Sequence, residues 1–190
     1  MFAPDFLKRS FEAALPYDRY VATGKPGERD AWTSFFDRVE LSESQRRLIG
    51  GFTREVNCLI LSGTWCGDCV QQVPMLARFE EANPEKFRLR LFDRDDSTEI
   101  RDALKLCGGN RVPVGVLLNE DFDVLTLVGD RSLNRYRAMA EKNLGPACPV
   151  PGAPVPEDEV RATLQDWVDE VERAHLMARL STKLRQRHGD

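Results

Sequence analysis

The feature that most restricts the fold of this chain is a strand-like run that leads directly into two closely spaced cysteines. Residues 56–61 form a short apolar run typical of a buried strand. The segment Thr-Trp-Cys-Gly-Asp-Cys at residues 64–69 follows and opens a helical pattern. The partial positive charge at a helix N-terminus stabilises a thiolate at Cys66. Because a thiolate attacks disulfides, and because Cys66 and Cys69 can form and open a small disulfide ring, the motif predicts dithiol–disulfide exchange.

The central part of the chain, about residues 56–144, alternates strand and helix patterns. We expect strands at 56–61, 87–92, 114–118 and 124–128 and helices at 69–83, 97–106 and 132–143. The last two strands form a hairpin through residues 119–121. This order predicts an α/β fold, a mixed sheet with parallel and antiparallel parts and helices on both sides.

Further segments flank this central domain, which we place at residues 51–145. Residues 1–50 are predicted to be a helical extension packed on the core, because their apolar side chains recur at helical spacing. Residues 146–156 are rich in proline and are predicted to form a stiff linker. Residues 157–190 are predicted to form one long helix, ending near residue 187. Its apolar stripe either packs on the domain or pairs with a second copy of the chain; it comprises Val160, Leu164, Trp167, Val168, Val171, Leu176 and Leu180.

The cysteine motif and its surroundings resemble the thioredoxin superfamily. Residues 65–69, Trp-Cys-Gly-Asp-Cys, are similar to the thioredoxin active site Trp-Cys-Gly-Pro-Cys. Pro74 stands where thioredoxins carry a helix-kinking proline, Val112-Pro113 where they carry a cis-proline, and Gly129 where a glycine lies near the active site. The resemblance spans about residues 50–144. It implies a thioredoxin-like mixed sheet flanked by helices, here with an N-terminal helical extension and a long C-terminal helix.

The resemblance also implies a role for each residue of the site. Cys66 is expected to attack the target disulfide and Cys69 to resolve the mixed disulfide. The expected substrate contacts are Trp65, Gly67, Asp68, Val112, Pro113 and Gly129. The implied function is a thiol–disulfide oxidoreductase that reduces protein disulfides, receives electrons from a reductase, and uses neither a cofactor nor a metal.

Two positions depart from the thioredoxin pattern. Ile60 stands where thioredoxins have a buried carboxylate that is proposed to move protons at the second cysteine, so proton handling must differ or be slower. Asp68 replaces the proline between the cysteines. An acidic residue favours the first turn of a helix. The alternative is that its charge raises the pKa of Cys66, in which case Asp68→Pro makes the protein more oxidising.

Three other functions compete with disulfide reduction. A zinc site needs two more ligands at a compatible spacing, whereas Cys107 and Cys148 are isolated and His175 and His188 lie far along the last helix. A protein-binding module or scaffold with minor redox activity would use the helical extensions, but it has no need of both sulfurs. Thiol peroxidases of this superfamily usually have a Thr-x-x-Cys motif, which neither active-site cysteine matches.

The remaining cysteines and an acidic run are interpreted mainly as structural. Cys58 is expected to pack in the core, and Cys107 to be a small buried hydrophobe rather than a third redox thiol. Cys148 falls in the linker, where it is open to oxidation. The acidic run at residues 93–96 is expected to end a strand and cap the next helix rather than to bind metal.

Charge and cysteine content restrict the setting. The net charge of −4 gives no electrostatic basis for binding nucleic acid. No apolar run approaches the roughly 20 residues of a membrane span, and charged side chains interrupt residues 1–15, where a signal peptide would be apolar. The five cysteines are too few and too unevenly spaced for a secreted disulfide scaffold. We therefore expect a cytoplasmic protein without membrane or nucleic-acid partners.

Overall fold

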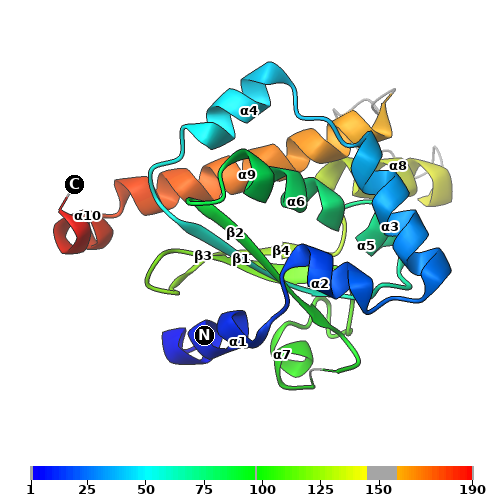
Figure 1. Ribbon diagram of the computed structural model, residues 1–190, viewed down its shortest axis with the longest axis horizontal. Helices are drawn as coiled ribbons and strands as arrows, with labels where there is room; N and C mark the ends of the chain where they lie inside the picture. The colour runs from blue at the N-terminus through cyan, green and yellow to red at the C-terminus, as the bar shows by residue number, and fades with distance from the viewer. Residues whose placement is uncertain (1, 97, 145–157, 190) are drawn as a thin grey trace.

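A four-stranded mixed sheet forms the centre of the computed structural model, which describes residues 2–96, 98–144 and 158–189 (Figure 1). The strands are β1 (Val56–Ser62), β2 (Phe87–Asp93), β3 (Val114–Leu118) and β4 (Val124–Gly129), in the order β2-β1-β3-β4. β1 pairs parallel to β2 and antiparallel to β3, and β3 pairs antiparallel to β4. The predicted mixed sheet and its four strands are confirmed, whereas the predicted linker at 146–156 lies outside the described residues.

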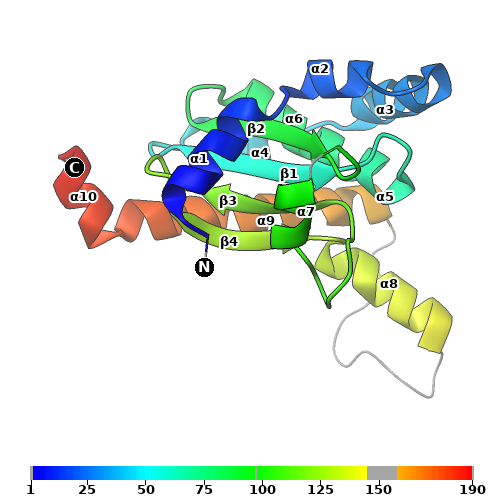
Figure 2. The ribbon, with the colours of Figure 1, turned by 90° about the horizontal axis from the view of Figure 1, so that it is seen from below.

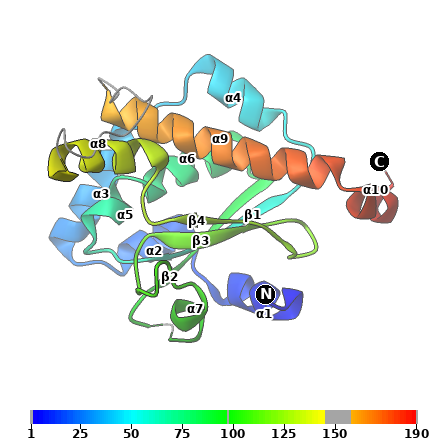
Figure 3. The same ribbon diagram turned by 180° about the vertical axis from the view of Figure 1, so that it is seen from behind.

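Helices cover both faces of the sheet. α6 (Val73–Ala82) and α9 (Glu159–Leu180) lie on one face, with α8 (Leu133–Leu144) next to α9 (Figures 1 and 3). α1 (Pro4–Ala13) and the short α7 (Thr98–Ala103) lie on the other (Figure 2). Every residue of β1 and β3 is buried, because both strands are central and covered on both sides. Accessible functional groups are therefore expected at the ends of the central strands and not on the faces of the sheet.

The N-terminal helices share the core of the sheet. After α1 come α2 (Tyr17–Ala22), α3 (Pro26–Arg38) and α4 (Glu43–Gly50). Leu7, Tyr20, Trp32 and Ile49 are buried in the same apolar cluster as the strands. Leu15 also pairs with Leu91 of the edge strand β2 through two backbone hydrogen bonds of 2.9 and 2.8 Å. The first 50 residues thus continue the core instead of forming a separate body.

The helix that follows the cysteine motif is divided, where the sequence predicts one helix over residues 69–83. α5 (Gly67–Val70) ends at Gln71, and α6 begins at Val73. Gln72 leaves the helical conformation, with φ −128°, and its buried side chain bonds to the backbone of Asp130 and Ser132. Pro74 consequently lies in the first turn of α6, where its missing N–H costs no helical hydrogen bond, and does not kink a continuous helix.

The C-terminal segment is also divided, where the sequence predicts one helix to residue 187. α9 ends at Leu180, and Ser181 caps a second helix, α10 (Thr182–His188), by accepting a hydrogen bond from the Leu184 amide. The predicted stripe is buried from Leu164 to Val171, but Leu176 and Leu180 are exposed. Helical spacing instead brings three other side chains into the core, Ala174, His175 and Ala178. Most of the stripe therefore packs within the domain.

No helix among the described residues is both long and apolar enough to cross a membrane.

Candidate active site

The two cysteines lie where β1 gives way to α5. Cys66 is the N-cap residue of α5 and is half-buried, while Cys69 lies one turn further and is completely buried. Both are free thiols in this structure, as are the other cysteines of the described residues, Cys58 and Cys107. One sulfur is thus accessible to a substrate and the other stands behind it.

The environment separates the proton affinities of the two sulfurs. The hydrogen bond from the Cys69 thiol, helped by the backbone N–H groups of Cys69 and Asp68, lowers the pKa of Cys66 to about 6 against the cost of partial burial. Burial and the neighbouring Cys66 raise the pKa of Cys69. The pair therefore holds a thiolate at Cys66 and a proton on Cys69 at neutral pH.

This pKa predicts how the reactivity of Cys66 depends on pH. Because only the thiolate reacts, alkylation of Cys66 by iodoacetamide is expected to rise about tenfold from about pH 5 to pH 7 and then to level off. Mass spectrometry of the alkylated peptide gives the rate, with Cys66→Ser as the background. A rate that climbs steadily to pH 9, as for an ordinary thiol, would contradict the prediction.

Val112 and Pro113 lie opposite Cys66. In its protonated form the Cys66 thiol donates to the Val112 carbonyl, with a sulfur–oxygen distance of 3.6 Å, and the Val112–Pro113 peptide bond is cis, as the thioredoxin resemblance implies. The loop before β3 thus places backbone polar groups beside the reactive sulfur.

Gly129 ends β4 directly behind Pro113. Its φ is +111°, a conformation that favours glycine, and a Cβ there would lie 2.3 Å from the Pro113 carbonyl oxygen. Gly129 therefore supports the proline loop through close backbone packing. Gly67, in contrast, has no atom within 4 Å of the position of a Cβ, so the fold itself does not require a glycine there.

Trp65 provides an exposed aromatic surface beside Cys66. Its side chain is 49% exposed, and the guanidinium carbon of Arg94 lies 4.5 Å from its ring centroid. A side chain on Gly63 would overlap the same ring, with a Cβ only 2.7 Å from a ring carbon. The ring therefore packs against Arg94 and the backbone at Gly63 while about half of it stays exposed.

Asp68 is paired with two arginines of the segment that begins α8. Arg131 and Arg135 contact its two carboxylate oxygens at 2.5 and 2.9 Å. Arg135 also reaches Gln71 and Glu159, at 2.7 and 3.1 Å. The charge of Asp68 still acts to raise the pKa of Cys66, but it is the smallest of the named effects. The carboxylate thus ties the cysteine loop to α8 more than it opposes the thiolate.

The N-terminal helices hold the loop from the other side. The Trp32 indole donates to the Thr64 carbonyl at 2.9 Å, and the Thr64 hydroxyl donates to Glu28 at 2.7 Å. Sequence reasoning did not find these residues, nor Arg131 and Arg135. No local pattern marks them, because an apolar residue at helical spacing and an arginine near a helix start do not reveal their tertiary partners.

Other sequence predictions have mixed outcomes. Cys58 is buried as expected, but Cys107 is exposed, with a φ of +49°, because it lies in a tight turn after α7 and not in the core. Asp93 ends β2 as expected, and it accepts from the Asp95 amide at 2.9 Å. His175 accepts from the Thr53 amide at 3.1 Å and stacks on Phe52. In the described part of the chain, no three potential metal ligands cluster.

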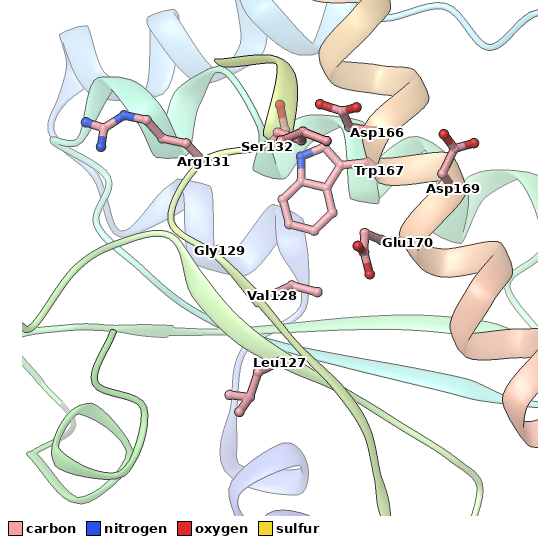
Figure 4. Close-up of a pocket in the computed structure, with 10 residues that line it drawn as sticks. Leu127, Val128, Gly129, Arg131, Ser132, Asp166, Trp167, Asp169 and Glu170 are labelled. Atoms are coloured by element: carbon pink, nitrogen blue, oxygen red, sulfur yellow. The ribbon is translucent and has the colours of Figure 1, made fainter. Parts of the chain in front are cut away.

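A pocket of about 260 Å³ adjoins the site between the end of β4, the start of α8 and α9 (Figure 4). It shares Gly129 and Arg131 with the surroundings of the dithiol, and Trp167 also lines it. Figure 4 shows the Arg131 side chain pointing away from the three carboxylates that α9 contributes, those of Asp166, Asp169 and Glu170. The pocket is therefore a neighbour of the dithiol and does not contain it.

Comparison with known proteins gives a family and a fold. The family model described as thioredoxin matches residues 14–142, so the match includes most of the N-terminal helices. A protein of unknown function from Pseudomonas aeruginosa, PA1234, has a crystal structure that is 19% identical, with a TM-score of 0.57 over 87% of this chain and 90% of its own. An HIV epitope-scaffold is likewise 19% identical, with a TM-score of 0.58 over 88% and 92% of the two chains. No curated protein matches the sequence.

Proposed function

We propose, from the premise that this chain belongs to the thioredoxin family, that it is a thiol–disulfide oxidoreductase that reduces protein disulfides in the cytoplasm. The proposal rests on the difference in accessibility and pKa between the two sulfurs. Cys66 is accessible, with its pKa lowered to about 6, while Cys69 is buried one turn behind it and keeps its proton. This pairing suits an attacking and a resolving thiol.

The proposed reaction moves two electrons from the dithiol to the substrate. The Cys66 thiolate attacks a substrate sulfur, a Cys66–substrate disulfide forms, and the other substrate sulfur leaves as a thiolate that takes a proton. Cys69 then loses its proton and attacks Cys66, which breaks the mixed disulfide and releases the second substrate thiol. The protein is left with a Cys66–Cys69 disulfide, which a reductase converts back to the dithiol.

The surroundings of Cys66 favour an extended protein segment as the substrate. The Val112 backbone lies beside the sulfur and can pair with a peptide, and Trp65 offers an open apolar surface next to it. Gly67 has no side chain, and the space beside it is open, so a substrate can come close to the backbone next to Cys66. We therefore propose Trp65, Gly67, Val112 and Pro113 as substrate contacts, with Gly129 acting behind Pro113.

A scaffold function receives less support from the packing. That alternative places the binding surface on the helical extensions, yet their apolar faces lie mainly in the shared core, as Trp32 and Trp167 do. The exposed aromatic ring beside a cysteine is instead Trp65, which points to the dithiol as the working surface.

Insulin reduction tests the proposed function. The wild-type chain with dithiothreitol is expected to accelerate precipitation of the insulin B chain well above dithiothreitol alone. The midpoint potential, measured by equilibration with glutathione, is expected between about −270 and −220 mV, because a pKa near 6 stabilises the reduced form slightly more than one near 7. Absence of catalysis in the wild type would refute the proposal.

Removing the charge of Asp68 should make the protein slightly more oxidising. Asp68 raises the pKa of Cys66, so Asp68→Asn is expected to stabilise the thiolate and raise the midpoint potential by about 10–20 mV. The shift is small because two arginines already pair with the carboxylate. Asp68→Pro should move the potential in the same direction, and Asp68→Glu is the control that keeps the charge. A midpoint that stays constant or falls in Asp68→Asn would show that this charge does not act on Cys66.

A further inference from the structure

Two buried hydroxyl groups lie next to Cys69, where the sequence has no carboxylate. Ser62 is the last residue of β1 and is completely buried, and Tyr20 of α2 is 1% exposed. Neither hydroxyl has a hydrogen-bond partner of good geometry among the described residues. A buried hydroxyl without a well-formed hydrogen bond destabilises the fold, so two of them side by side need an explanation.

The Tyr20 hydroxyl interacts with the Ser62 hydroxyl, which in turn interacts with the sulfur of Cys69. The Ser62 hydroxyl and the Gly63 backbone N–H both act on the Cys69 sulfur in the direction that stabilises its thiolate. The Tyr20 hydroxyl in turn interacts with Ser62, and the charges of Cys69 and Cys66 both reach Tyr20. α2 therefore meets the end of β1 and α5 beneath the dithiol, although it lies far from both in the sequence.

The position of Ser62 relates it to the missing carboxylate. Ile60 and Ser62 are two residues apart in β1, so their side chains point to the same face of the sheet. Ile60 is 1% exposed and apolar, and it offers no proton acceptor. Ser62, two residues nearer to the cysteines, places a hydroxyl on this face of β1, where thioredoxins have a carboxylate at the position of Ile60.

We propose that the Ser62 hydroxyl and the Gly63 N–H form a preorganised site for the Cys69 thiolate, and that Tyr20 positions Ser62 for this role. The inference rests on the proposed function and concerns its second step. As Cys69 attacks Cys66, its proton ends on the departing thiolate, and the negative charge that develops on the buried sulfur is stabilised by donors already in place. Such donors act strongly where water is excluded.

The second step can be followed directly with 5,5′-dithiobis(2-nitrobenzoate). Attack by Cys66 releases one nitrothiobenzoate, and attack by Cys69 on the mixed disulfide releases the second, so stopped-flow absorbance separates the steps. All proteins carry Cys107→Ser and Cys148→Ser, which leaves the pair and the buried Cys58 as the remaining thiols. Ser62→Ala is expected to slow the second release about 10- to 100-fold and to leave the first within about twofold.

Tyrosine variants provide a matched control. Tyr17 and Tyr20 both have buried hydroxyls that lack a hydrogen bond of good geometry, and both rings pack against Trp32, with centroids 6.0 and 5.6 Å away. Only Tyr20 interacts with Ser62. Tyr20→Phe is expected to slow the second release about threefold to tenfold, whereas Tyr17→Phe should leave it unchanged. Ser62→Thr, which keeps the hydroxyl, should restore most of the rate.

The outcomes separate this inference from the proposed function. If the wild type releases both equivalents rapidly and Ser62→Ala does the same, the thiolate site is refuted while the dithiol function stands. Equal slowing by Tyr17→Phe and Tyr20→Phe would also refute it, since both would then act through general packing. If the wild type never releases the second equivalent, the pair does not close, and both proposals fail.

Discussion

Cys66→Ser is expected to abolish disulfide reduction while leaving the fold intact. Cys66 carries the accessible thiolate, and a serine hydroxyl does not ionise near neutral pH, so no attacking group remains. Insulin reduction should fall by at least about 1000-fold, to the rate of dithiothreitol alone. The half-buried sulfur contacts the Val112 carbonyl and the Cys69 thiol, and a hydroxyl can replace it in both contacts. Thermal unfolding should therefore change little.

Two further cysteine variants test the separate roles of the thiols. Cys69→Ser is expected to form the mixed disulfide and to stop there, so that a covalent complex with insulin accumulates and is visible by mass spectrometry. Cys107→Ser is the matched control, because Cys107 is an exposed thiol outside the dithiol loop. Insulin reduction that survives in Cys66→Ser, or that is lost in Cys107→Ser, would place the reactive thiol elsewhere.

Gly129→Ala is expected to produce the largest loss of stability among single-residue changes near the site. The added Cβ would lie 2.3 Å from the Pro113 oxygen and 2.8 Å from the Val114 Cα, and the backbone has a φ of +111°. Both neighbours are backbone atoms, which cannot rotate away as a side chain can. We expect the free energy of unfolding to fall by about 3 kcal/mol or more, with the Tm lower by about 6–12 °C.

Gly27→Ala is the matched control for this prediction. Gly27 is the second residue of α3, and a Cβ there meets no atom within 4 Å. Alanine in a helix is more favourable than glycine, so the Tm should stay the same or rise slightly. Differential scanning calorimetry of both variants measures the effect. A Gly129→Ala protein as stable as the wild type would show that β4 and the proline loop can move apart.

The strands and the dithiol were predictable from the sequence because their signals are local. Short apolar runs mark β1 and β3, and alternation marks β2, so each strand is recognised from five to seven neighbouring residues. The spacing of Cys66 and Cys69 after such a run places both sulfurs at the first turn of a helix. The glycine and proline positions, Gly129 and Pro113, were recognisable through the family resemblance.

Helix boundaries were less predictable, because packing decides them. The apolar residues of 69–83 recur at helical spacing, yet Gln72 leaves the helix, and its side chain bonds to the backbone at Asp130 and Ser132, about 60 residues away. Ser181 ends α9 in a similar way, although the periodic pattern continues past it. In both cases a polar side chain outweighs a weak local preference.

The sequence by itself determined that two sulfurs stand at the end of a buried strand, one turn apart, since spacing and hydrophobic pattern are properties of neighbouring residues. Only the tertiary structure decided what surrounds them. Tyr20 reaches Ser62 from a helix that lies some 40 residues earlier, and Arg131 and Arg135 reach Asp68 from more than 60 residues later. The pKa of a thiol depends on which groups lie near it in space, and only the folded chain brings these distant residues close to the dithiol.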